Sequence, residues 1–94
     1  MKINILGVPH KVKEVKKINE SCEGTVQGII YHEDATILLK KSMPKDLKEQ
    51  VLYHEIVHGI LVALGYNDLS TDETFVQGFS NALYQMFKLR KDMK

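Results

Sequence analysis

Residues 47–64 constrain the fold more than any other part of the chain. Placed on a helix, their apolar side chains leave hardly any side of that helix polar. A helix that is apolar all round is a buried helix, so we expect one here. Pro44 and Asp46 favour a helix start just before this stretch, and Gly65 favours its end. The apolar residues are Leu47, Val51, Leu52, Ile56, Val57, Ile60, Leu61, Val62, Ala63 and Leu64.

The middle of this predicted helix carries three polar side chains, His54, Glu55 and His58. Positions 54 and 58 lie about 40° apart around a helix and one turn apart along it, so both imidazoles can reach one metal ion. Burying two histidines and a glutamate without partners is costly, and a bound metal would be such a partner. The alternative is a pair of hydrogen-bonded histidines within the core.

The spacing H-E-x-x-H is the signature of zinc peptidases. His54 and His58 would be ligands of Zn²⁺, at bond lengths of about 2.0 to 2.1 Å. Glu55 lies about 100° round from His54, too far round to be a comfortable ligand but well placed to hold a metal-bound water. Because zinc lowers the pKa of that water towards neutrality, Glu55 would act as general base and then carry the proton to the leaving amine.

Length and composition limit the other possibilities. With 94 residues, 44% of them hydrophobic and 27% charged, the chain predicts one small domain over residues 1–94. A net charge of +1 gives no electrostatic case for nucleic acid, and no apolar run approaches the roughly 20 residues that span a bilayer. Cys22 is the single cysteine, and the first residues lack the apolar core of a signal peptide. We therefore expect a cytoplasmic protein.

The remaining elements predict an α+β fold. Residues 3–6 favour a strand, which Val12, Val15 and Ile18 continue past a bend, and residues 20–24 form a loop. Residues 25–40 predict a hairpin with its turn at residues 33–34. We expect a small antiparallel sheet of about three strands, followed by the H-E-x-x-H helix and a second, C-terminal helix that opens at residues 70–73.

A catalytic zinc normally has three protein ligands and one open position. A third histidine six residues after His58 is excluded because that position is Leu64. The candidates are Asp72 and Glu73 at the start of the second helix. Glu73 also fits a capping box with Ser70, in which its side chain would bond back to the Ser70 amide. The helical pattern alone leaves the choice between the two carboxylates open.

A hairpin, an H-E-x-x-H helix and a following helix together resemble the small zincin domain of the ImmA/IrrE-type metallopeptidases and their phage-encoded relatives. In that family the following helix carries a glutamate, a small or branched residue, an amide, an aromatic and a small residue. The corresponding residues here are Glu73, Val76, Gln77, Phe79 and Ser80. The resemblance covers roughly residues 25–90 and implies a gluzincin site with Glu73 as third ligand.

Zincins commonly hold a peptide antiparallel to the edge strand above the active-site helix. The resemblance therefore implies a peptide or protein substrate along residues 35–40 as the edge strand. A carbonyl under attack also needs a hydrogen-bond donor for its developing charge, and Tyr84 is our candidate, with Tyr53 and Tyr31 as alternatives. His10 and His32 are expected in or beside loops, outside the site.

The sequence thus favours a minimal zinc-dependent peptidase of narrow specificity, and the resemblance to phage-encoded relatives implies a phage or mobile-element origin as one further possibility. The alternative is a structural zinc module or degenerate peptidase that acts by binding a partner protein. Glu55 separates the two, because a purely structural site has no need of a free carboxylate beside the metal. The sequence leaves the oligomeric state open.

Overall fold

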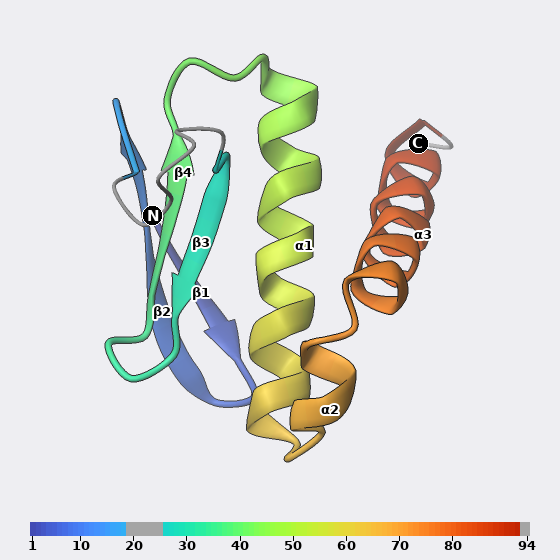
Figure 1. The fold of residues 1–94 in the computed structure, drawn as a ribbon. Coiled ribbons are helices and arrows are strands. Elements are labelled where there is room, and N and C mark those ends of the chain that lie inside the picture. Colours follow the sequence, from blue (N-terminus) through green and yellow to red (C-terminus); the bar gives the residue numbers. More distant parts are fainter. Residues whose placement is uncertain (19–25, 93–94) are drawn as a thin grey trace.

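The computed structural model describes residues 1–18 and 26–92 and shows an α+β fold. The elements in chain order are β1 (Lys2–Ile5), β2 (Val8–Val15), β3 (Gly28–Tyr31), β4 (Thr36–Lys40), α1 (Lys45–Ala63), α2 (Asn67–Ser70) and α3 (Glu73–Asp92). Figure 1 shows three layers, in which α1 lies between the sheet on one side and α2 with α3 on the other. Cys22 and the predicted loop at residues 20–24 lie outside the described residues.

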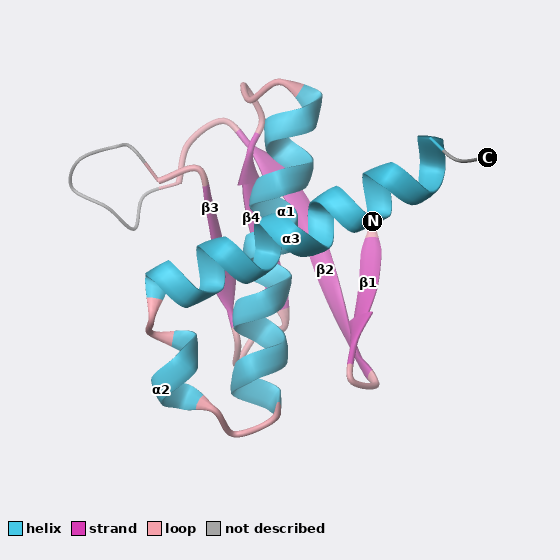
Figure 2. Ribbon diagram, turned by 90° about the vertical axis from the view of Figure 1, so that its right-hand side faces the viewer, coloured by secondary structure: helices cyan, strands magenta, loops and turns pink. Residues whose placement is uncertain are grey.

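The middle layer explains why residues 47–64 are apolar on nearly every side. One side of α1 covers β1, β3 and β4, and the other side contacts α2 and α3. The helix α3 crosses α1 obliquely (Figure 2). Two buried clusters fill these contacts, and the removal of their apolar surface from water favours this packing. The first is Ile5, Ile30, Ile37, Leu39 and Met43 beneath α1, and the second is Val57, Leu61 and Val76 between the two long helices. The predicted helix is confirmed.

The sheet differs from the antiparallel sheet of about three strands that we predicted. Within residues 1–18 and 26–92 there are four strands in the order β1-β2-β4-β3, and β2 pairs with β4 in parallel. The weak pattern after Pro9 belongs to β2, which turns back from β1 at Leu6 and Gly7, both with positive φ. Because the chain then passes to the far edge and returns through the β3–β4 hairpin, β4 lies inside the sheet.

This order overturns our prediction that residues 35–40 form the edge strand. Hydrogen bonds to β2 and β3 occupy both sides of β4, so no substrate strand can be added there. Ile37, the second residue of β4, is completely buried. Among the described strands, β1 and β3 lie at the edges of the sheet, and residues next to and within β3 line the cleft that His54 and Glu73 border.

Gly59 brings α1 close to the sheet one residue after His58. A Cβ at this position would lie 2.9 Å from Cδ1 of Ile5 and 3.0 Å from Cδ1 of Ile30. Those distances are shorter than ordinary van der Waals contact between carbon atoms. Because Gly59 has no side chain, α1 can approach the sheet closely next to His58, which helps to fix how far the two histidines lie from the sheet.

No helix in the described part of the chain is both long and apolar enough to cross a membrane.

Candidate metal centre

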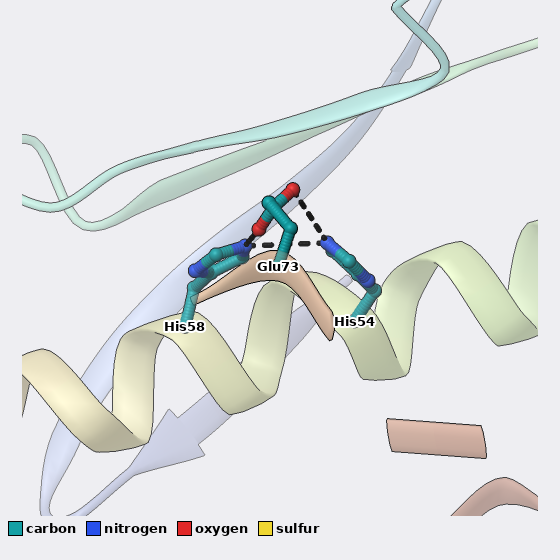
Figure 3. Close-up of side chains that lie close together, drawn as sticks. All are labelled: His54, His58 and Glu73. Carbon is teal, nitrogen blue, oxygen red and sulfur yellow. Dashed lines mark hydrogen bonds and ion pairs between the residues drawn. The ribbon is translucent and has the colours of Figure 1, made fainter. Parts of the chain in front are cut away.

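His54 and His58 of α1 and Glu73 of α3 direct their polar atoms to one point (Figure 3). The two imidazole Nε2 atoms are 3.2 Å apart. One carboxylate oxygen of Glu73 lies 3.0 Å from Nε2 of His58, and the other lies 3.6 Å from Nε2 of His54. The sequence placed these residues on two different helices, and the fold brings all three together.

These three separations match the donor set of a tetrahedral metal site. In a tetrahedron with bonds of about 2.0 Å, as zinc makes to imidazole nitrogen, neighbouring donor atoms lie roughly 3.3 Å apart. The two imidazole nitrogens are 3.2 Å apart, and each has a different oxygen of Glu73 at 3.6 or 3.0 Å, so the observed values scatter around that length. Two histidines and a carboxylate are also a donor combination that zinc accepts in catalytic sites. The residues present therefore fit a zinc ion, with one of the four positions left open.

The start of α3 separates the two candidate carboxylates. The Asp72 side chain accepts a hydrogen bond of 3.1 Å from the backbone N–H of Phe75, which makes Asp72 the N-cap of α3. Glu73 is the first helical residue, and its carboxylate contacts the histidines instead of the Ser70 amide. The capping-box alternative is wrong because Ser70 belongs to α2, a short helix that the sequence pattern did not predict.

Ser70 has a role that the sequence reasoning missed. Its buried hydroxyl lies 3.2 Å from Nδ1 of His58 and 3.5 Å from the His58 backbone carbonyl oxygen. The hydroxyl can donate to that carbonyl and accept from Nδ1–H, which leaves Nε2 of His58 with its lone pair towards the cluster. The only sequence signal was a small polar residue near the H-E-x-x-H helix, which we had considered only as a member of the alternative capping box.

The two histidines differ in their surroundings. Burial lowers the pKa of His58, and the carboxylate of Glu73 only partly opposes that effect, so His58 favours the neutral form that binds metals. Nδ1 of His54 is buried and has no hydrogen-bond partner among the described residues. A buried polar atom without a partner is costly, and a favourable bond at Nε2 of the same ring would offset that cost.

Glu55 lies beside the cluster without joining it. It is one of the few buried charged side chains, and burial together with the nearby Glu73 carboxylate raises its pKa to about 7. Carboxyl groups tuned towards neutral pH suit general acid–base catalysis. Glu55 shares a cleft of about 440 Å³ with His54 and Glu73, so the predicted base faces the same space as two of the predicted ligands.

The cleft also reaches the outer edge of β3, which pairs with no other strand in the part of the chain that the structure describes. Val26, Gln27 and Gly28 line it from the β3 side, and Gln77 lines it from α3. The Gln27 carbonyl accepts from Lys40, and antiparallel pairing alternates. The backbone groups of Gly28 and Ile30 therefore point away from β4, towards an incoming strand.

Tyr84, our candidate donor for the carbonyl oxygen, lies elsewhere. It is eleven residues after Glu73 on a straight helix, about 16 Å along its axis, and it lines neither groove that His54 and Glu73 border. Its ring packs edge-on against Tyr53 with 5.7 Å between ring centroids. Tyr31 is half-buried in β3. His10 lies in β2, where its Nδ1 is 2.9 Å from the Val8 carbonyl oxygen, and His32 follows β3.

Comparisons with protein-family models, with curated proteins and with solved structures found no match for this chain. The function of this chain is therefore inferred from the geometry of the site.

Proposed function

We propose that this protein is a minimal zinc-dependent peptidase in which His54, His58 and Glu73 hold the metal. One observation carries the proposal: the two imidazole Nε2 atoms and the carboxylate oxygens of Glu73 lie 3.0 to 3.6 Å apart, close to the spacing of donor atoms around a tetrahedral zinc ion. The buried carboxyl of Glu55 in the same cleft distinguishes this site from a purely structural one. Zn²⁺ bound there would activate a water molecule and polarise the carbonyl group under attack.

Three side chains of the protein would have separate roles beside the metal. Glu55, with a pKa of about 7, can take a proton from the attacking water and later give it to the leaving amine. Ser70 holds the ring of His58 in the orientation that presents Nε2. Gln77 lines both grooves beside the cluster and replaces Tyr84 as our candidate donor to the carbonyl oxygen.

We propose that the substrate is an extended peptide paired with the free edge of β3. Gly28 and Ile30 would offer backbone donors and acceptors on alternate residues, next to the cleft that contains Glu55. Once a cleaved peptide is identified, N-methylation of its amides tests this arrangement. Turnover should fall at alternate positions of the peptide. Equal tolerance at every position would contradict pairing with β3.

The proposal agrees with the resemblance to the ImmA/IrrE-type zincins, in which Glu73 would be the gluzincin ligand. The competing function is a structural zinc module that acts by binding another protein. One feature favours it: a metal held by His54, His58 and Glu73 would join α3 to α1. The Glu73 side chain is 69% exposed, so the cluster is open to water on one side.

The deciding experiment combines metal content with turnover. We would measure zinc in the purified chain by elemental analysis, and then incubate the zinc-loaded protein with a mixture of unfolded peptides followed by mass spectrometry. We expect one zinc per chain, and new peptide termini that the Glu55→Gln variant does not generate although it keeps its zinc. Equal zinc with no cleavage by either protein would favour the structural module. A chain that takes up no zinc would end both proposals.

A further inference from the structure

The outer face of α3 carries a second apolar stripe that no described residue covers. Its members recur at alternating spacings of four and three, the pattern of a helix that packs along another helix. The face that packs on α1 is a different one, centred on Val76, Ser80 and Tyr84. The exposed stripe is Phe75, Phe79, Ala82, Met86 and Leu89, and the rings of Phe75 and Phe79 stack with 5.7 Å between their centroids.

Gly78 beside this stripe adds an independent observation. It lies inside α3, where glycine costs about 1 kcal/mol relative to alanine. A Cβ on Gly78 would meet no other atom within 4 Å, so the packing of this chain does not require a glycine here. Gly78 and Ala82 are one turn apart and together leave a shallow place where a second helix backbone could approach closely.

We propose that a second copy of this chain packs on the stripe, with the two α3 helices antiparallel and the two-fold axis at Ala82. The stripe is nearly palindromic about that residue. In this arrangement Phe75 faces Leu89 of the other copy, Phe79 faces Met86, and the two small Ala82 side chains meet on the axis. Large side chains thus flank a small centre on both sides, which lets the helices interlock.

The charges along α3 select the antiparallel direction. Asp72 and Glu73 lie at its start, and Arg90 and Lys91 lie at its end. Asp72 and Arg90 border the same side of the stripe, about 60° from its centre. Antiparallel pairing therefore brings Arg90 of each copy towards Asp72 of the other, whereas parallel pairing would bring like charges together. Arg90 forms no ion pair with another residue in the described part of the chain.

The length of the stripe sets the expected affinity. From Phe75 to Leu89 the contact extends about 21 Å along the helix, or two heptads. This is short for a stable dimer, and interfaces at the small end of the range are weak. We expect a dissociation constant on the order of 10 to 100 µM.

Sedimentation velocity of the full chain tests the proposal, over a range from about 5 µM to about 1 mM that brackets this constant. Phe79→Lys should weaken dimerisation by at least about tenfold. The matched control is Leu64→Lys, because Leu64 is 55% exposed and Phe79 is 48% exposed, yet Leu64 lies at the end of α1. A chain that remains monomeric at the highest concentration would overturn the proposal, as would self-association that Phe79→Lys leaves unchanged.

Disulfide crosslinking tests the direction of the helices in a chain whose own cysteine is removed by Cys22→Ser. Two cysteines can bond only when their Cα atoms are within about 7 Å. With oxidised glutathione as oxidant, Ala82→Cys should give a covalent dimer, because the two copies meet there. Leu89→Cys should give none, since Leu89 faces Phe75 of the other copy. Crosslinking through both positions would show a parallel pair, and crosslinking through neither would show that the stripe is not the interface.

Discussion

The first turn of α3 and its later turns meet α1 through opposite kinds of chemistry. At the first turn, Glu73 reaches the imidazoles of His54 and His58 with polar contacts. Further along, Tyr84 and Phe87 pack on Tyr53, with ring centroids 5.7 and 5.6 Å away. Tyr53 and His54 are neighbours in α1, yet Tyr53 belongs to the aromatic contact with α3 and His54 belongs to the polar one. A polar side chain on α3 is therefore a candidate for chemistry only where the oblique crossing brings it above His54 and His58.

The largest difference between the two regions should appear in zinc affinity. Glu73→Ala removes a donor atom and should weaken zinc binding by about 1,000-fold, beyond the 10- to 100-fold cost of losing an outer partner. A chromophoric chelator in competition measures the affinity. Asp72→Asn is the matched control, because asparagine keeps the cap of α3 while removing the charge. A large loss in Asp72→Asn with little change in Glu73→Ala would assign the third ligand to Asp72.

The next effect concerns the stability of the metal-free protein. The pKa of Glu55 is raised to about 7 from 4.5 by burial and by Glu73, so the folded form binds more protons than the unfolded form between these values. Its unfolding free energy should therefore fall as the pH rises from about 4.5 to about 7. Glu55→Gln removes this penalty and should be more stable than the natural chain at pH 8, by up to about 3 kcal/mol.

Urea unfolding of both proteins at a series of pH values makes this measurement. The lowered pKa of His58 acts in the opposite sense, because a group that charges more readily when unfolded favours unfolding at low pH. Both proteins contain His58, so their difference isolates Glu55. An unchanged difference across the pH range would mean that Glu55 is not held in a desolvated place.

A smaller effect is expected from the partner of His58. Ser70→Ala removes the hydroxyl at 3.2 Å from Nδ1 and should weaken zinc binding by about 10- to 100-fold. Thr71→Ala is the control, since the one hydrogen bond of the exposed Thr71 hydroxyl within the described residues is to the Asp68 carbonyl oxygen. The visible spectrum of the Co²⁺-loaded protein should change in Ser70→Ala alone. Identical affinities and spectra for the two variants would exclude a positioning role for Ser70.

The smallest effect is expected in the aromatic contact between the two long helices, where Tyr84 packs on Tyr53. The Tyr84 hydroxyl is buried without a hydrogen-bond partner among the described residues, so Tyr84→Phe should change the unfolding free energy by less than about 1 kcal/mol. Zinc affinity and turnover should stay the same. A clear loss of turnover with unchanged zinc would return Tyr84 to the catalytic group and contradict the separation of the two regions.

The parts of this structure that were predictable depend on local pattern. The apolar residues on nearly every side of segment 47–64 identified α1, and the spacing of His54 and His58 was sufficient to predict that their imidazoles would meet. Glu73 was named with Asp72 as an alternative, because both lie in the same turn and a helical pattern cannot tell a cap from a ligand.

The features that we missed depend on contacts between distant segments. The parallel pairing of β2 with β4 makes β3 the edge strand. The residue pattern within one strand does not indicate which strands lie beside it. The crossing of α3 over α1 decides that Tyr84 packs on Tyr53, away from the histidines. Ser70 was misassigned because its partner is the His58 ring, twelve residues earlier in the chain.

Glu73 is both a member of the cluster and the first residue of α3. Any ligand that fixes its carboxylate also fixes the base of the helix that carries the exposed stripe. Metal uptake and pairing of two chains would then be linked equilibria, and each would strengthen the other by the same factor. In such a system zinc supply sets how many copies are paired. Dilution of the protein, in turn, loosens its hold on zinc.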